Sequence, residues 1–185
     1  MNDDKLLIEQ VLAGKTDSFG ELVRKYQDRL YNTLVHVTGS CHEAEEIAQD
    51  AMLQAFSKLS SFRGNSSFYT WLYRIAFNLS VSRQRKQRPR VSLDQMQESV
   101  GVDPADNAEL PEEAAERDER AVQVRAALSK LSDEYRAILV LREMEDCDYE
   151  TIADMLSVPI GTVRSRLHRA RMLLRTHLTP AIEGH

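Results

Sequence analysis

The chain has 185 residues, of which 42% are hydrophobic and 29% charged, with a formal net charge of −5. This length suits one medium or two small domains, and the low content of aromatic residues (6%), glycine and proline favours helices over short strands. The sequence excludes a membrane-spanning chain, because no run of about 18 apolar residues occurs, and the acidic start "MNDDKLLIEQ" is not typical of a secretory signal.

The cysteines and the known catalytic motifs give no sign of an enzyme. Cys41 and Cys147 lie far apart, which indicates a reducing, cytoplasmic setting. No H-E-x-x-H, P-loop or G-x-S-x-G motif is present. His36 and His42 lie near Cys41, but their spacing matches no standard metal site. We therefore expect no catalytic activity, no cofactor and no bound metal.

The N-terminal region predicts two amphipathic helices, "DSFGELVRKYQDRLYNTLVHV" and "CHEAEEIAQDAMLQAFSKL", because apolar residues recur in both at helical spacing. We expect the second helix to turn Ala55 and Phe56 inward with its other apolar residues. Its opposite face carries an acidic stripe made of Glu45, Glu46, Gln49 and Asp50. Taken alone, such a stripe indicates a solvated surface.

The next stretch, "SFRGNSSFYTWLYRIAFNLSVSRQRKQ", has a polar loop between Phe62 and Phe68 and then a helix with a basic end. Aromatic rings among bases and small polar residues are typical of surfaces that bind single-stranded DNA. Within the helix, spacing favours a core role for Trp71, Leu72, Ile75 and Leu79. Tyr73, Asn78 and the loop remain the binding candidates. For Asn78 the alternative role is local capping or packing.

Charge is segregated at the centre of the chain. Residues 83–90 hold five bases and no acid, and residues 91–110 hold five acids and no base. The acidic stretch has no sustained hydrophobic periodicity and contains Gly101 and Pro104, so it is predicted to be a linker. Either it serves solubility, or it follows a path meant for nucleic acid.

The C-terminal region predicts four helices. The first begins at Pro111, a favourable first position because proline lacks only an amide that is already unpaired there. Ser132 and Asp148 are expected to cap the second and third helices. After a turn at 157–159, the last helix is expected to begin at Ile160 or Gly161, and the final two helices form a helix-turn-helix pattern.

The last helix separates its apolar and basic residues onto opposite faces. Val163, Leu167, Ala170 and Leu174 form a narrow stripe that is expected to pack on the domain. The opposite face carries Arg164, Ser165, His168 and Arg169, with Arg166 and Arg171 on the flanks. Such a face is either solvated or in contact with DNA. We favour DNA, because the arginine fork matches the O6 and N7 atoms of guanine.

Three motifs occur in an order that identifies a family: "EAEEIAQDAMLQAF", "FRGNSSFYTWLYRIAFN" and "YETIADMLSVPIGTVRSRLHRAR", with the acidic stretch before the third. Over nearly its whole length, the sequence resembles the extracytoplasmic-function (ECF) sigma factors of bacterial RNA polymerase. The resemblance implies an all-α fold of two small helical domains joined by an acidic flexible linker: sigma domain 2 at residues 1–90, the linker at 91–110, and sigma domain 4 with the helix-turn-helix at 111–185.

The resemblance also implies a function and partners. An alternative sigma factor binds core RNA polymerase, directs it to promoters through the −10 and −35 elements, and promotes promoter melting. The partners are the β′ clamp coiled coil and the β flap of the core enzyme, promoter DNA and, as is common in the family, an anti-sigma factor; no membrane insertion is implied. The acidic linker corresponds to a connector that enters the RNA path.

Residue roles follow from the same correspondence. The acidic stripe of Glu45, Glu46, Gln49 and Asp50 corresponds to the surface that docks on the clamp, with glutamate at 46 where the family has aspartate. The −10 element is assigned to Lys58, Phe62, Asn65, Ser66, Tyr73, Asn78 and Arg83. The −35 element is assigned to Thr162, Arg164, Ser165, His168, Arg169 and Arg171, of which His168 stands at a position that varies among relatives.

A different class of protein, a helix-turn-helix regulator that binds an operator without polymerase, also explains the C-terminal region. It leaves the "FRGNSSF" loop and the acidic stripe without a purpose. Run-off transcription with core polymerase separates the two hypotheses.

Overall fold

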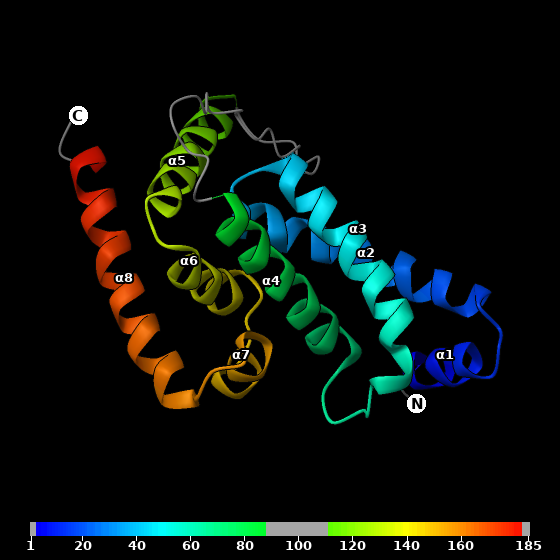
Figure 1. Cartoon of the computed structure of the whole chain (residues 1–185). Helices are drawn as coiled ribbons and strands as arrows, with labels where there is room; N and C mark the ends of the chain where they lie inside the picture. The colour runs from blue at the N-terminus through cyan, green and yellow to red at the C-terminus, as the bar shows by residue number, and fades with distance from the viewer. Residues whose placement is uncertain (1–2, 88–110, 183–185) are drawn as a thin grey trace.

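The computed structural model describes residues 3–87 and 111–182, and within them it is built of α-helices without strands. The predicted acidic linker, 91–110, lies outside the described residues. Figure 1 shows the helices in two groups that lie against each other, α1–α4 and α5–α8. In chain order they are α1 (Asp3–Leu12), α2 (Asp17–Thr38), α3 (Cys41–Lys58), the short 3₁₀ turn η1 (Leu59–Ser61), α4 (Phe68–Gln87), α5 (Pro111–Ser129), α6 (Asp133–Leu139), the π-turn η3 (Val140–Met144), α7 (Tyr149–Leu156) and α8 (Ile160–Ile182). The all-α class predicted from the sequence is confirmed.

The connection between α2 and α3 follows from two residues. Gly39 ends α2 in the left-handed conformation at φ 75°, which glycine adopts without steric cost, and its N–H bonds Val35 O at 2.8 Å. Ser40 then begins α3, because its hydroxyl accepts the Glu43 amide at 3.2 Å. So short a link makes the two helices antiparallel neighbours.

The N-terminal half is held by apolar burial on α2, α3 and α4. The fully buried side chains include Leu22, Leu30, Leu34, Ile47 and Leu72. Each contributes roughly 1.5–3 kcal/mol relative to exposure. The predicted inward face of α3 is confirmed except at its end: Ala55 is fully buried, whereas Phe56 is 43% exposed and packs edge-on against Phe19.

Helix α1 was not among the helices predicted from the sequence. It is short and rests on α2 through a buried carboxylate. Asp4, 5% exposed, accepts hydrogen bonds from Lys25 Nζ and Tyr26 Oη, both at 2.5 Å. These bonds satisfy an acid that burial otherwise makes costly.

The C-terminal half contains the predicted helix-turn-helix. Asp148 caps α7 by accepting the Thr151 amide at 2.7 Å, as predicted, but Ser132 makes no side-chain cap bond to α6. Ser157 ends α7 with a positive φ of 54°, and α8 begins at Ile160. In α8 the predicted inward stripe is confirmed at Val163, Leu167 and Ala170, which are at most 1% exposed, whereas Leu174 is half-buried.

The two halves pack directly on each other, α4 against α7 and α2 against α6 (Figure 1). Arg136 of α6 crosses this contact: it is 7% exposed and donates to Val37 O of α2 and to three carbonyls of its own half. Burial lowers the pKa of Arg136, while Asp133 and Glu43 favour its charge. The buried apolar residues of both halves thereby form one continuous cluster.

Among the described helices, none combines the length and the hydropathy that a lipid bilayer span requires.

Candidate nucleic-acid and protein interfaces

The acidic stripe forms one exposed face of α3, which we call the acidic face (Glu45, Glu46, Gln49 and Asp50). Gln49 donates to Glu45 at 3.3 Å, one turn apart. Glu46 and Asp50 are 49% and 45% exposed at the side chain, and both accept from Arg83 of α4, at 2.6 and 2.5 Å. The face is therefore an accessible anionic surface, partly neutralised by one arginine.

Arg83 was predicted to contact DNA, and the structure joins it instead to the surface predicted for polymerase. Burial disfavours its charge, but the hydrogen bonds to Asp50 and Glu46 outweigh that effect and raise the pKa of the Arg83 guanidinium. Arg83 therefore stays cationic. It was assigned to the predicted DNA interface, and its charge lies on the acidic face, the predicted polymerase interface.

A groove of about 970 Å³ runs between α2 and α3 beside the acidic face, and sequence reasoning did not find it. Its lining combines apolar and polar side chains, and Glu45 and Gln49 belong both to the groove and to the acidic face. The apolar lining includes Phe19, Val23, Met52, Leu53 and Phe56. Only the structure reveals the groove, through the 69% exposure of Leu53 and the outward position of Phe56, which the sequence pattern placed inward.

The loop between Phe62 and Phe68 is held at both ends and open in the middle. Phe62 is half-buried, with ring centroids 6.0 Å from Phe68 and 5.3 Å from Trp71. Gly64 takes a φ of 70°, a conformation that favours glycine. The small polar residues at the tip, Asn65 and Ser66, are exposed and half-buried respectively.

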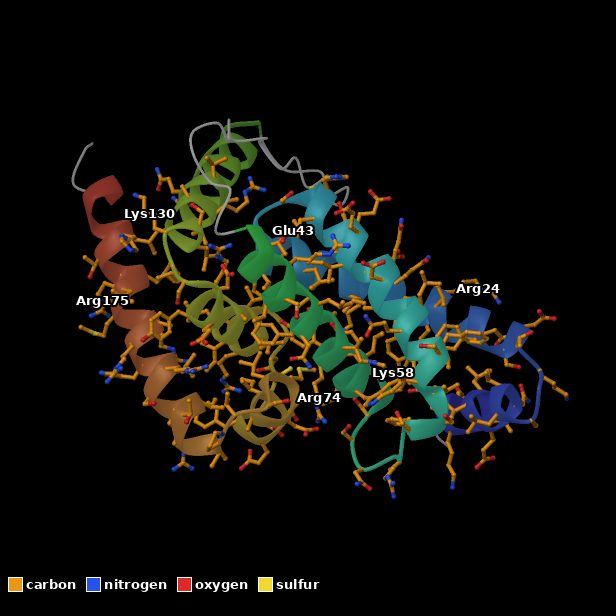
Figure 2. All side chains as sticks on the ribbon, in the orientation of Figure 1. Arg24, Glu43, Lys58, Arg74, Lys130 and Arg175 are labelled. Carbon is orange, nitrogen blue, oxygen red and sulfur yellow. The ribbon has the colours of Figure 1, made fainter. Side chains whose placement is uncertain are left out.

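The first turn of α4 is fixed by Ser67, whose hydroxyl accepts the Thr70 amide at 3.0 Å. Lys58, labelled in Figure 2, lies at the end of α3 just before this loop and donates to Gln54 at 3.2 Å. Asn78 is exposed at the middle of α4. Lys58, the loop and Asn78 are thus all accessible.

Tyr73 requires a correction. Its side chain is fully buried, and its hydroxyl has no hydrogen-bond partner. Its ring packs near Tyr69 and Phe77, and the charged neighbours of its hydroxyl include Glu145 of the C-terminal half. In the described arrangement it therefore lines no open pocket, because the residue lies beneath the contact between the two halves.

The outer face of α8 presents the residues predicted for the −35 element. Arg164, Ser165, His168 and Arg169 are exposed, and Thr162 is half-buried. Side chains are described at residues 3–83 and 120–178, and among these Arg164 and Arg169 form no ion pair.

The flanking arginines differ. Arg171 bonds Glu143 at 2.6 Å, and Arg166 pairs with Glu134 at 3.0 Å. The hydrogen bonds to Glu143 raise the pKa of Arg171. The flanks are thus tied to α6 and η3, whereas the centre of the outer face keeps its charge free for a ligand.

Within the described part of the chain, no three His, Cys, Asp or Glu side chains are grouped in a way that would hold a metal ion.

Two family models match the chain. Residues 22–90 match sigma-70 region 2, and residues 121–174 match sigma-70 region 4. These spans contain the acidic face and the 62–68 loop in the first case, and the helix-turn-helix in the second.

Curated relatives match over almost the full length. The chain is 38% identical over 182 residues to the ECF RNA polymerase sigma factor SigW of Bacillus subtilis, covering 94% of this chain and 96% of that protein. It is 39% identical over 184 residues to the RNA polymerase sigma-H factor of Pseudomonas aeruginosa, with coverage of 97% and 95%.

Among solved structures, the sigma factor RpoE from Bartonella quintana, in complex with the anti-sigma factor NepR, matches with a TM-score of 0.69 and 26% identity. The match covers 87% of this chain and 96% of the other. Fold, family models and full-length relatives agree: the chain belongs to the ECF sigma factors, which direct RNA polymerase in transcription initiation.

Proposed function

We propose that this chain is an alternative sigma factor that docks on core RNA polymerase, reads the −10 and −35 elements of specific promoters, and promotes melting at the −10 element. In this proposal residues 1–90 act as domain 2, residues 91–110 as the acidic linker, and residues 111–185 as domain 4. The observation that carries it is the outer face of α8, whose central arginines are exposed and unpaired among the described residues while the opposite stripe is buried.

The −35 element is the natural ligand of that face. A helix-turn-helix inserts its second helix in the major groove, where arginine distinguishes guanine from the other bases. Arg164 and Arg169 are the base-reading candidates, with His168 between them as a residue that tunes sequence choice. Thr162, Ser165 and Arg171 are candidates for phosphate or base-edge contacts.

The −10 element is assigned to the 62–68 loop and its neighbours. Holding an unpaired base costs a few kcal/mol and needs a pocket with small residues and an edge-reading amide. The exposed Asn65 and Asn78 supply amides, Ser66 a hydroxyl, Phe62 a ring, and Lys58 a cation.

Docking on the polymerase is assigned to the acidic face. The face is anionic and exposed, so it favours a basic partner such as the β′ clamp coiled coil. The adjoining groove between α2 and α3 adds apolar surface, which suits a helix laid against it. The β flap is proposed as the second contact of the core enzyme.

The relatives support two further parts of the proposal, an anti-sigma partner and a cytoplasmic location. The matching RpoE structure contains an anti-sigma factor, and we include such a factor among the partners of this chain. The relatives are transcription regulators and not enzymes. Promoter DNA and core polymerase place the function in the cytoplasm.

The test is run-off transcription with purified core polymerase and a library of promoter templates. We expect transcripts only from templates that share a −10 and a −35 sequence, and only when this chain is present. An autonomous regulator would instead bind duplex DNA alone and yield no polymerase-dependent transcript, and that result would reject the proposal.

A further inference from the structure

Helix α1 rests on α2 through a carboxylate that has two unequal partners. Asp4 is 5% exposed and accepts from Lys25 Nζ and from Tyr26 Oη, each at 2.5 Å. Lys25 is exposed, whereas Tyr26 is half-buried. Burial and the bond to Asp4 raise the pKa of the Tyr26 hydroxyl, which therefore stays a protonated donor at neutral pH. The bond between Asp4 and Tyr26 is thus a charge-assisted link between the two helices.

The Tyr26 ring extends this link to the first turn of α4. Its centroid lies 5.6 Å from that of Phe68 and 5.7 Å from that of Tyr69. Phe68 is 2% exposed, and a buried ring in a close-packed interior has little room to move away from its neighbour. The orientation of the Tyr26 ring therefore helps to set where Phe68 lies.

Phe68 ends the 62–68 loop. Its ring centroid is 6.0 Å from that of Phe62, which begins the loop, and 5.9 Å from that of Trp71 on the next turn of α4. The centroids of Phe62 and Trp71 are themselves 5.3 Å apart. Because these three rings form one packed cluster, a shift of Phe68 would move both ends of the loop and the small polar residues at its tip.

The beginning of the loop also rests on α1. Helix α1 contacts η1, the turn that leads into Phe62, near the N-terminus in Figure 1. Ile8 and Val11 of α1 are at most 9% exposed, so apolar burial holds the helix in place as well. Helix α1 therefore supports the loop at both ends, through η1 and through Tyr26.

Stability alone is a weak reason for an acid at position 4. A buried ion pair costs desolvation and often stabilises a fold no better than well-packed apolar side chains do. A charge-assisted hydrogen bond adds direction, because it favours one orientation of its donor. A loop that holds an unpaired base has to keep its groups within about 0.5 Å of the working geometry. The bond between Asp4 and Tyr26 supplies the kind of constraint that such a loop requires.

We propose that Asp4 is a positioning residue for base recognition at the −10 element: its bond to the Tyr26 hydroxyl orients the Tyr26 ring, which sets Phe68 and the shape of the 62–68 loop. This inference rests on the proposed function, because it adds to the role assigned there to the loop. Asp4 and Tyr26 touch no DNA in this mechanism, and they act through Phe68.

The test measures base discrimination, the ratio between the affinities of holoenzyme for single-stranded −10 oligonucleotides with the preferred base and with each other base at the same position. Tyr26→Phe removes the hydroxyl and keeps the ring. Asp4→Leu keeps a branched side chain and removes the acceptor. The matched control is Lys25→Met, which removes the other hydrogen bond of Asp4 and leaves Tyr26 in place.

We expect Tyr26→Phe and Asp4→Leu each to lower discrimination at one −10 position by about fivefold, the effect of one net hydrogen bond. The double variant should lose no more than either single variant, because both substitutions remove the same bond. Lys25→Met should keep the discrimination of the wild-type chain. Binding to a −35 duplex should be unchanged in all these variants, and urea unfolding measures the stability that each one loses.

Three results would overturn the inference: unchanged discrimination in Tyr26→Phe or in a folded Asp4→Leu chain, an equal loss in Lys25→Met, or a loss at all positions that follows the fall in the unfolding midpoint. The wild-type chain tests the proposed function separately. Wild-type holoenzyme without any base preference rejects the −10 assignment itself, whereas a preference that survives in Tyr26→Phe rejects the positioning role alone.

Discussion

At the scale of single residues, Arg83 joins two interfaces that the sequence assigned separately. Its guanidinium bonds Glu46 and Asp50 on the acidic face, while its predicted partner was DNA. A basic polymerase surface that took these two carboxylates would release the arginine. Substitutions on the acidic face therefore change two things, the docking charge and the state of Arg83.

This coupling fixes the design of the docking experiment. Glu46→Gln with Asp50→Asn should weaken binding to core polymerase, because a basic partner loses two opposing charges, and the loss should shrink at high salt. Arg83→Met should keep core binding or strengthen it, since it leaves both carboxylates unpaired. The measurement is a core-binding titration at two salt concentrations.

The control for that titration is Glu9→Gln with Glu21→Gln, the same charge change at exposed positions of α1 and α2. Equal affinities for the acidic-face variant and this control would show that the face is solvated.

Asn78 carries the second prediction at this scale. It is exposed on α4, and a side chain there that bonds a base edge affects one position of the −10 element only. Asn78→Ala should alter preference at one base of a single-stranded −10 oligonucleotide bound by holoenzyme, with −35 binding intact. A uniform loss at all bases, together with a lower unfolding midpoint, would assign Asn78 to local packing.

At the scale of elements, α8 separates tasks along its length and around its axis. The inward stripe packs on the domain, the flanks at Arg166 and Arg171 are tied to Glu134 and Glu143, and the outer face is open. Ion pairs that bridge α8 to neighbouring elements fix its angle, so the flanks position what the outer face reads.

From this division we expect different results from three alanine substitutions. Arg164→Ala and Arg169→Ala should each cost about 1–3 kcal/mol of binding to a −35 duplex and relax specificity at one position. Arg171→Ala should lower affinity evenly across sequences, because a tethered flank contacts phosphate. Binding of holoenzyme to duplexes varied base by base measures both the affinity and the specificity. Unchanged affinity in all three variants would show that the outer face is solvated.

At the scale of the whole molecule, the contact between the halves includes a histidine, a residue type whose ordinary pKa is about 6.5. His36 of α2 is half-buried, and desolvation lowers its pKa, aided by Arg125 and opposed by Glu145. Because the folded state binds the proton less well than the unfolded state does, stability is highest above the unfolded pKa of about 6.5 and falls as the pH drops below it.

We therefore expect His36→Gln to flatten the pH dependence of stability between about pH 7.5 and 5.5. The urea midpoint of the wild-type chain should fall more over this interval than that of the variant. His42→Gln is the matched control, because His42 is exposed on α3. Parallel curves for wild type and His36→Gln would show that His36 does not govern acid sensitivity.

Much of this protein is determined by its sequence alone. Hydrophobic periodicity determined the helices and their buried faces. An apolar stripe such as Val163, Leu167 and Ala170 is buried against the rest of the protein wherever the helix lies. Local chemistry set the cap at Asp148 and the start of α8 at Ile160. Three motifs in order set the family, because few folds reuse that combination.

Only the tertiary structure decided which side chains meet across the chain. Arg83 with Glu46, Arg74 with Asp154, and Glu145 with Arg29 are pairs 37, 80 and 116 residues apart, and no local pattern encodes them. Burial of Tyr73 involves the same long-range packing, because Glu145 and Cys147 of the other half lie close enough to act electrostatically on its hydroxyl. Periodicity reports which face of a helix is apolar, whereas long-range packing determines what that face and its charged edges touch.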